Sequence, residues 1–173
     1  MEATTNTDDY IAGFARAMRR LASTVCVVAT HDGKQPYGMV ATAVTSLSAA
    51  PPSLLVCINR DASSHDVIAR IGRFSVTLLR KDQREISDHF GSRYTHLERF
   101  GTARWTTAQH WQLPHLESAQ ATLFCHLAQK FEHGTHTVFI GNVLETEIDE
   151  AVDPLLYADG SYRWLNRADA CPE

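Results

Sequence analysis

Short segments with the alternating polarity of β-strands, separated by turn residues, constrain the fold of this chain more than any other feature. Residues 119–131 alternate between apolar and polar side chains, and residues 135–148 repeat the pattern. Such alternation is typical of strands that bury one face. Other segments with β-branched or apolar composition are also expected to be strands: 24–30, 37–48, 53–59, 73–79, 155–157 and 162–165.

Helical patterns are fewer. Residues 7–22 carry apolar side chains at three- and four-residue spacing, which predicts a helix with one apolar stripe. A second helix is expected to end at Gly72 and a third at Gly91, since glycine is common just after a helix. Residues 92–118 show no sustained period and are expected to be mostly loop.

The order of these segments favours a mainly β fold of the α+β type. Helices do not alternate with every strand, which argues against a doubly wound parallel sheet. A closed or partly closed antiparallel barrel with peripheral helices fits better. The 173 residues are expected to form a single domain, 1–173, with its core at about 10–165, because no linker or internal repeat divides them.

Charge and cysteine content exclude several classes of function. The chain carries 16 Lys and Arg against 20 Asp and Glu, so it lacks the basic excess of a general nucleic-acid binder. The sequence contains no signal-peptide pattern and no apolar run of membrane-spanning length, which predicts a cytoplasmic protein. Its four cysteines form no CxxC pair, and the three that lie in apolar segments are expected to be buried free thiols. The nine histidines match no metal motif, so no metal site is expected.

Hydroxyl side chains cluster on both sides of the segment 53–59. Because a helix N-terminus with hydroxyl donors suits a phosphate, this cluster is a candidate anion site. The same residue types are also common in turns and helix caps, so the residues alone leave both interpretations open. The cluster consists of Thr42, Thr45, Ser46 and Ser48 before Pro51-Pro52, and of Asn59, Ser63 and Ser64 after the strand.

Five segments in a fixed order carry a family resemblance that extends over most of residues 14–165. The segments are 38–48 with Pro51-Pro52 and 53–56, 59–63, 74–79 with 83–100, Gly134-Thr135-His136, and Asp159-Gly160-Ser161-Tyr162. Together they resemble the flavin reductase-like family. The resemblance implies an FMN-binding split β-barrel, usually a homodimer.

The resemblance also implies an activity. Family members are typically NAD(P)H:flavin oxidoreductases that supply reduced FMN or FAD to a separate monooxygenase, with NADH or NADPH as the hydride donor. Because the reactive atoms belong to the two nucleotides, such an enzyme needs no nucleophile of its own. This agrees with the lack of a nucleophile elbow, a P-loop or a GxGxxG motif in the sequence.

The residues implied to bind flavin fall into four groups. Three would lie along the isoalloxazine ring, two would reach the ribityl chain or phosphate, two would hold the phosphate, and one would close over the ring. In that order they are Thr42, Ala43 and Val44; Ser46 and Ser48; Asn59 and Ser63; and Phe90.

His136 is implied to be the catalytic residue beside the nicotinamide, where it would orient the carboxamide or transfer a proton. Two positions depart from the family pattern. Thr135 stands where many members carry Asp, and Val40 stands where many carry Thr or Ser. These departures bear on nicotinamide preference and flavin affinity.

Other interpretations stay open at this point. The chain could be a flavin-binding electron carrier or redox sensor without turnover, or a barrel that binds another phosphorylated ligand. The sequence decides neither FMN against FAD nor NADH against NADPH. Cys57 and Tyr162 are interpreted as packing residues, and the arginines of the first helix as a solvated face.

Overall fold

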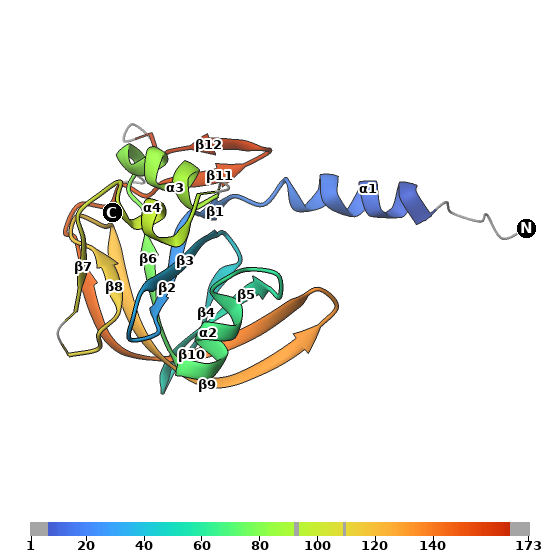
Figure 1. Cartoon of the computed structure of the whole chain (residues 1–173). Coiled ribbons are helices and arrows are strands. Elements are labelled where there is room, and N and C mark those ends of the chain that lie inside the picture. Colours follow the sequence, from blue (N-terminus) through green and yellow to red (C-terminus); the bar gives the residue numbers. More distant parts are fainter. Residues whose placement is uncertain (1–6, 92–93, 109, 167–173) are drawn as a thin grey trace, which may run out of the picture.

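Seven antiparallel strands form one continuous sheet, which curls around its own apolar face (Figure 1). The order of the strands across the sheet is β3-β2-β6-β9-β10-β5-β4. The computed structural model describes residues 7–91, 94–108 and 110–166. The strands of this sheet are β2 (Cys26–His31), β3 (Pro36–Ala41), β4 (Val44–Ala49), β5 (Pro52–Asn59), β6 (Arg73–Leu78), β9 (Ala121–His133) and β10 (His136–Ile148).

The two edge strands of this sheet follow one another along the chain. The β-prone segment 37–48 is divided between β3 and β4, which lie at opposite edges of the sheet and are joined only by Thr42 and Ala43. So short a link brings the two edges together, and the sheet must therefore curl into a barrel that is split along this seam. The predicted antiparallel barrel is confirmed.

Smaller elements surround the barrel. A three-stranded sheet of order β1-β11-β12 consists of β1 (Ser23–Thr24), β11 (Leu156–Ala158) and β12 (Ser161–Arg163). The turn at Asp159 and Gly160 has positive φ at both residues, 50° and 74°, so the predicted hairpin has the type I′ geometry that this dipeptide favours. The helices are α1 (Thr7–Met18), α2 (His65–Ile71), the 3-10 turn η1 (Lys81–Gln83), α3 (Arg84–Phe90) and α4 (His96–Phe100).

Two apolar cores lie on opposite faces of β2 and β6. The first fills the barrel, where Val28, Phe74 and Phe139 pack with Ile68 of α2. The second lies outside the barrel, between β2 and the α3 region. Because β2 is covered on both faces, the run Cys26 to Thr30 is buried throughout, as its continuous apolar sequence would lead one to expect.

The expectation that residues 92–118 are mostly loop needs correction. This segment contains α4 and a small two-stranded sheet of β7 (Trp105–Thr107) and β8 (Pro114–Leu116). A capping box starts α4: the Thr95 hydroxyl accepts from the backbone N–H of Glu98, and the Glu98 carboxylate accepts from that of Thr95. The Thr95 hydroxyl also lies 2.7 Å from the Glu98 carboxylate, and its hydrogen bond, together with that of the Thr95 backbone N–H, lowers the pKa of Glu98. The Thr-x-x-Glu signal is present in the sequence and was overlooked.

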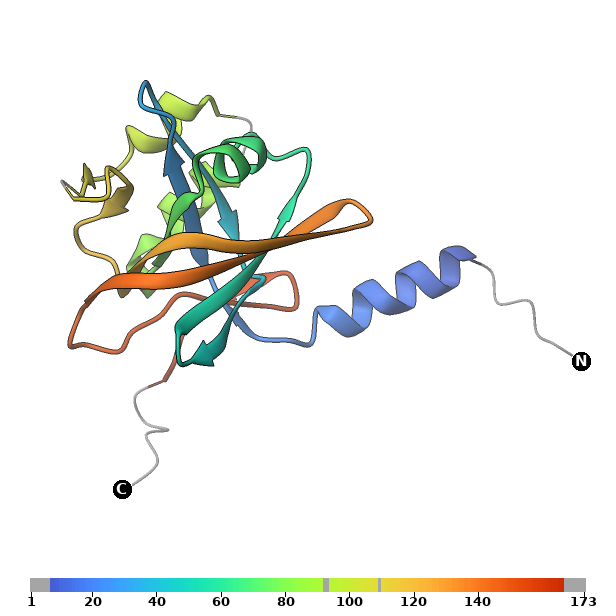
Figure 2. The same cartoon turned by 90° about the horizontal axis from the view of Figure 1, so that it is seen from below.

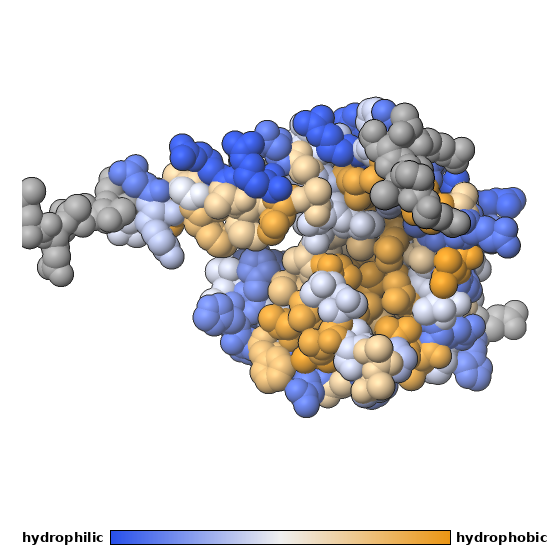
Figure 3. Space-filling model, turned by 180° about the vertical axis from the view of Figure 1, so that it is seen from behind, coloured by the Kyte–Doolittle hydropathy of each residue, from blue (hydrophilic) through white to orange (hydrophobic). Residues whose placement is uncertain are grey.

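Helix α1 projects from the barrel in both views (Figures 1 and 2). Its predicted apolar stripe exists, but none of its residues is buried. Figure 2 also shows the β9–β10 hairpin reaching past the body of the sheet. Apolar side chains gather on the barrel surface below the helix in Figure 3. Exposed apolar residues of the barrel strands include Leu47, Leu144 and Ile148.

Candidate functional site

The link between the two edge strands borders a cavity. We call Thr42 and Ala43 the strap; both residues are exposed. A cavity of about 440 Å³, which we call the strap cavity, lies between the strap, the C-terminal end of α1 and the β11–β12 hairpin. Its lining comprises Ala15, Met18, Arg19, Leu21, Ser23, Thr42, Ala43, Val44, Thr45, Leu55, Cys57, Tyr157, Ala158, Asp159 and Gly160.

The floor of the strap cavity is the outer face of β5. Leu55 and Cys57 line it from alternate positions of that strand, and the backbone N–H of Cys57 donates to the Ala43 carbonyl at 3.0 Å. Asn59 is two residues further along the same face, a rise of about 7 Å. It pairs with His136 of β10 in the strand register. The strap cavity therefore leads along one face toward Asn59 and His136.

A tight loop follows Asn59 and leads into α2. The Asn59 side-chain oxygen accepts from the backbone N–H of Asp61 at 2.9 Å, which leaves its amide nitrogen as a donor. Ser63 is exposed at the end of this loop, whereas Ser64 is fully buried. Asn59 and Ser63 thus belong to the same tight loop. The tip of the β9–β10 hairpin lies beside this loop, because the backbone N–H of Arg60 donates to the Thr135 carbonyl.

Ser46 and Ser48 do not belong to this group. They pair with Leu54 and Ser53 near the start of β5. The distance from Ser53 to Asn59 along the strand is about 20 Å. Both serines line another cavity of about 550 Å³, which adjoins the strap cavity at Ser23, Val44 and Thr45. The register places them away from Asn59, and the prediction that they reach the ribityl chain or phosphate stays a prediction.

Phe90 also lies elsewhere than expected. Its side chain is 3% exposed and packs edge-on against Phe100, with ring centroids 5.0 Å apart, and against Trp105 at 5.1 Å. It also contacts Gly38 of β3, where an added Cβ would lie 2.8 Å from the ring. Phe90 is therefore a core residue that supports β3, and its ring is not placed to close over the strap cavity.

The Thr135 hydroxyl lies beside the imidazole of His136. Its oxygen lies 2.9 Å from Nδ1 of His136, and both residues are exposed at the hairpin tip. A hydroxyl can fix the orientation of the imidazole, but it adds no negative charge beside it. The effect of Thr135 on nicotinamide preference stays a prediction.

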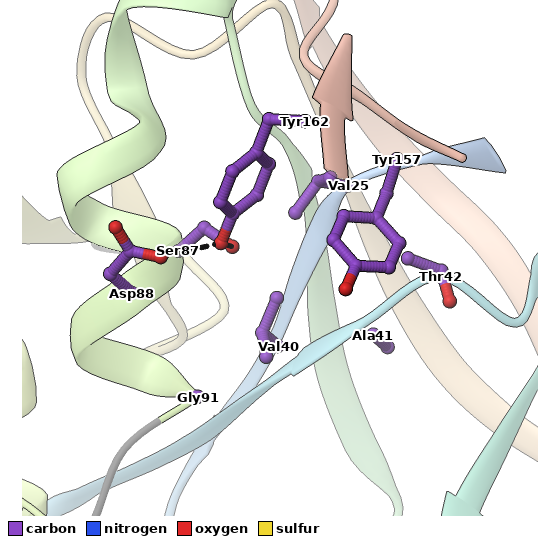
Figure 4. A pocket seen from close by; sticks show the side chains of 9 residues that line it. All are labelled: Val25, Val40, Ala41, Thr42, Ser87, Asp88, Gly91, Tyr157 and Tyr162. Carbon is purple, nitrogen blue, oxygen red and sulfur yellow. Dashed lines mark hydrogen bonds between the residues drawn. The ribbon is translucent and has the colours of Figure 1, made fainter. Parts of the chain in front are cut away.

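A second cavity, which we call the tyrosine cavity, adjoins the strap cavity (Figure 4). It has a volume of about 340 Å³ and shares Thr42 and Tyr157 with the strap cavity. The Tyr162 hydroxyl lies 2.7 Å from Oδ1 of Asp88 and 3.0 Å from Oγ of Ser87. Its lining comprises Val25, Val40, Ala41, Thr42, Ser87, Asp88, Gly91, Tyr157 and Tyr162.

Sequence reasoning missed the contributions of Arg19, Tyr157 and Asp88 to these cavities. No local signal marks them, because they meet the strap only through contacts between distant segments. Burial raises the pKa of Tyr162, and the neighbouring Asp88 carboxylate raises it further. The Tyr162 phenol is therefore protonated at neutral pH and donates to that carboxylate. Tyr162 is more than a packing residue.

The described thiols fall into two kinds. Burial raises the pKa of both Cys26 and Cys125 to about 12. Cys57, by contrast, is half-buried and lines the strap cavity; Cys171 lies outside the described residues.

Within the described ranges, no three His, Cys, Asp or Glu side chains are grouped so as to hold a metal ion. None of the described helices is long and apolar enough to cross a membrane.

The fold and the site define a class of protein: a split antiparallel barrel with a cavity on its outer face, beside an exposed strap. Residues 18–166 match the family model of the flavin reductase like domain, and the chain belongs to that family. The particular relatives are reductases. This chain is 39% identical over 152 residues to the reductase component of FADH(2)-dependent resorcinol hydroxylase from Rhizobium sp. (strain MTP-10005), covering 86% of this chain and 84% of the relative.

Two further relatives have the same character. The FMN reductase (NADH) RutF from Stutzerimonas stutzeri (strain A1501) is 35% identical over 150 residues, with 87% of this chain and 86% of the relative covered. The Streptomyces globisporus NADH:FAD oxidoreductase SgcE6, solved with NAD and FAD fragments, superposes with a TM-score of 0.87 at 28% identity. That match covers 98% of this chain and 100% of the solved chain. The chain is a flavin reductase.

Proposed function

We propose that this protein uses NADH to reduce FMN or FAD and delivers the reduced flavin to a separate oxygenase. The family match over residues 18–166 supports the reductase activity. The name of the Rhizobium relative, a reductase component of a hydroxylase, supports the delivery to a second protein. The observation that carries the assignment is the strap cavity, whose floor on β5 ends at Cys57, two residues before Asn59 and the polar loop that leads to Ser63.

The residues present fit a bound flavin. A volume of about 440 Å³ lies in the usual range for small-molecule sites, roughly 300–1,000 Å³. Leu55, Cys57 and Val44 offer an apolar surface to a flat ring, and the strap exposes peptide groups at its edge. At the far end, the Asn59 amide and the Ser63 hydroxyl supply neutral donors for a phosphate. The separation between the two ends suits a ring and a phosphate joined by a short chain.

In the proposed mechanism the protein binds, orients and shields. When bound, the flavin accepts a hydride at N5 from the nicotinamide of NADH. Thr42 and Ala43 fix the ring through their backbone groups, and Asn59 and Ser63 hold the phosphate. The apolar side chains of the cavity exclude water from the reacting atoms. His136, held by Thr135, lies at the Asn59 end of this face, beside the proposed phosphate site, and its role beside the nicotinamide remains what the family resemblance implies.

The first experiment is NADH oxidation at 340 nm by the purified protein with FMN, FAD, riboflavin or no flavin, with flavin binding measured in parallel. Flavin-dependent turnover is the expected result, and the ratio among flavins identifies the preferred substrate. Tight flavin binding without turnover would favour the carrier or sensor alternative. Neither turnover nor binding would overturn the proposed site.

We also propose that the protein is a homodimer and is cytoplasmic. An isolated helix of 12 residues is marginal in water, yet Ile11 and Phe14 of α1 are 57% and 61% exposed. The barrel surface near β4 and β10 also exposes Leu47 and Ile148. Two copies related by a two-fold axis would cover both surfaces at once. Free thiols at Cys26, Cys57 and Cys125 and the use of NADH support the cytoplasmic assignment.

The test of the dimer is the molar mass from light scattering for the wild type and for Phe14→Glu. The expected result is a dimer that this substitution converts to a monomer. A monomeric wild type would refute the homodimer.

A further inference from the structure

His65 is a buried side chain that the proposed flavin site does not use. It is the first residue of α2, directly after the loop of residues 60–64, and it is 6% exposed. Its Nε2 lies 2.8 Å from Oγ1 of Thr137 in β10, and its ring meets Phe139 edge-on, with centroids 5.3 Å apart. Both Thr137 and Phe139 are fully buried. The imidazole thus joins the start of α2 to the inner face of β10.

The second ring nitrogen of His65 determines the direction of this hydrogen bond. Nδ1 lies 2.8 Å from Oδ1 of Asp66. A carboxylate at neutral pH only accepts hydrogen bonds, so Nδ1 carries a proton. In the neutral imidazole Nε2 is then an acceptor, and the Thr137 hydroxyl donates to it. Because both nitrogens are engaged, the ring is held in one orientation.

The start of α2 lacks the usual side-chain cap. Ser64 is the N-cap residue, and its side chain makes no capping hydrogen bond. Its Oγ is buried and has no hydrogen-bond partner among the described residues. The start of a helix is commonly fixed by such a bond. Here the buried contact between His65 and Thr137 is instead a side-chain bond that ties the first turn of α2 to the barrel.

The loop of residues 60–64 is attached to the β9–β10 hairpin at both of its ends. At its start, the backbone N–H of Arg60 donates to the Thr135 carbonyl at 3.0 Å. At its end, the His65 side chain meets Thr137, two residues further along the hairpin. The hairpin therefore fixes both ends of the loop that contains the proposed phosphate donor.

We propose that His65 is a positioning residue for flavin binding. Through its bond to Thr137, it holds the loop of residues 60–64 in the geometry in which the Ser63 hydroxyl meets the flavin phosphate. His65 itself does not touch the flavin, because its ring is buried against the inner face of the sheet. The inference rests on the proposed function, since it requires a phosphate at Ser63.

The effect of this contact should be specific to the phosphate. A donor that is already in place binds its ligand without an added cost of ordering. Riboflavin has the same ring as FMN but no phosphate, so a displaced loop should leave its binding unchanged. The ratio of the dissociation constants of riboflavin and FMN therefore reports the position of the loop, whereas a general loss of fold would weaken both flavins alike.

The test compares His65→Ala with His115→Ala. His115 of β8 is 7% exposed and meets Phe124 edge-on at 5.3 Å, so the two substitutions remove similarly buried imidazoles. His115 does not line the strap cavity. His65→Gln is the conservative variant, because its amide can replace Nε2 as the partner of Thr137.

Two quantities are measured for each variant. Dissociation constants for FMN and for riboflavin come from fluorescence titrations. Hydrogen exchange of the backbone amides of residues 60–65 is followed by mass spectrometry without flavin, so that the order of the loop is measured independently of ligand binding.

We expect His65→Ala to raise the dissociation constant for FMN about tenfold and that for riboflavin by less than about twofold. Amides of residues 60–65 should exchange faster. His65→Gln should restore most of the FMN affinity, and His115→Ala should change neither dissociation constant. Thr137→Val removes the same hydrogen bond from its other side and should reproduce the selective loss. The double variant of Thr137→Val with His65→Ala should then lose no more than either alone.

Three results would overturn the inference. An equal loss of affinity for FMN and riboflavin in His65→Ala would show that the substitution acts through the fold. Unchanged FMN binding, or a selective loss of the same size in His115→Ala, would remove His65 from phosphate recognition. A selective loss with unchanged exchange in the loop would place the phosphate on His65 itself.

Failure of the proposed function would look different. A wild type that binds FMN no more tightly than riboflavin would contradict the proposed phosphate site, and a wild type that binds neither would contradict the flavin site as a whole. The exchange measurement would still show in both cases whether His65 holds the loop, so the two failures are distinguishable.

Discussion

Cys57 offers a direct test of where the flavin lies, independent of turnover. Its thiol lines the floor of the strap cavity, so a ring bound there should cover it. Cys26 and Cys125, the other described cysteines, provide reference rates of alkylation within the same protein. With pKa values of about 12, Cys26 and Cys125 carry a thiolate in roughly one molecule in 10⁴ at pH 8, and both are buried. Iodoacetamide should therefore alkylate Cys57 far faster than either.

The expected protection follows from occupancy. At an FMN concentration of about 100 times Kd, the free fraction of sites is about 1%, so alkylation of Cys57 should slow about 100-fold. Riboflavin, which lacks the phosphate, should protect at its own saturating concentration, because the ring covers the thiol. Peptide mapping by mass spectrometry gives the rate for each cysteine separately, including Cys171.

One result would refute this reasoning. If FMN is bound at saturation, as judged by fluorescence, and Cys57 still reacts at the rate of the free protein, the ring does not lie in the strap cavity. Ser63→Ala provides the matched control. At the FMN concentration that protects the wild type 100-fold, protection should fall toward twofold to tenfold, because binding is weaker while the thiol is unchanged.

Three further outcomes are expected. Ser63→Ala should weaken FMN binding by about 10- to 100-fold, because the phosphate loses a hydrogen-bond donor. Ser48→Ala should leave the dissociation constant for FMN unchanged, because Ser48 lies beside the far end of β5. Equal losses of affinity in a fluorescence titration would contradict this argument from the strand register. His136→Ala should lower kcat with little change in flavin affinity, and a loss of affinity alone would reassign the residue to flavin binding. Alkaline pH should destabilise the protein. Burial raises the folded-state pKa of Cys26 and Cys125 from 9.0 to about 12. The contribution of these thiols to the free energy of unfolding is therefore complete below pH 9 and is lost between pH 9 and 12. The loss is about 1.4 kcal/mol per pH unit for each thiol. Urea titrations of the wild type and of Cys26→Ala/Cys125→Ala should diverge over that interval; parallel pH profiles would show that the thiols are not responsible.

The parts of the fold that the sequence predicted are those set by local pattern. Alternation marked β9 and β10, and Asp159-Gly160 marked the last hairpin, because residue type and backbone conformation are coupled at short range there. The capping box at Thr95 and Glu98 was equally local, and it was overlooked within an aromatic-rich segment. No short-range sequence pattern shows that β3 and β4 lie at opposite edges of the sheet, because their positions depend on how all the strands of the sheet pair.

The candidate site divides in the same way. Asn59 and Ser63 belong to one tight loop, so their proximity could be read from their spacing. Ser46 and Ser48 are closer in sequence to the strap, but the register of β4 against β5 carries them away from the loop. The role of Phe90 was misjudged because an aromatic residue near a site can equally belong to the core, and only its contacts decide which.

The position of the strap explains why the chemistry depends on few side chains. Buried apolar residues form the core of the barrel, and the seam at Thr42 and Ala43 is where peptide groups are exposed between two strands. Recognition by peptide groups depends little on residue type. It also leaves the bound ring open on its outer side. A site with that exposure suits an enzyme whose two nucleotides must both enter and leave, and whose reduced product has to reach a second protein.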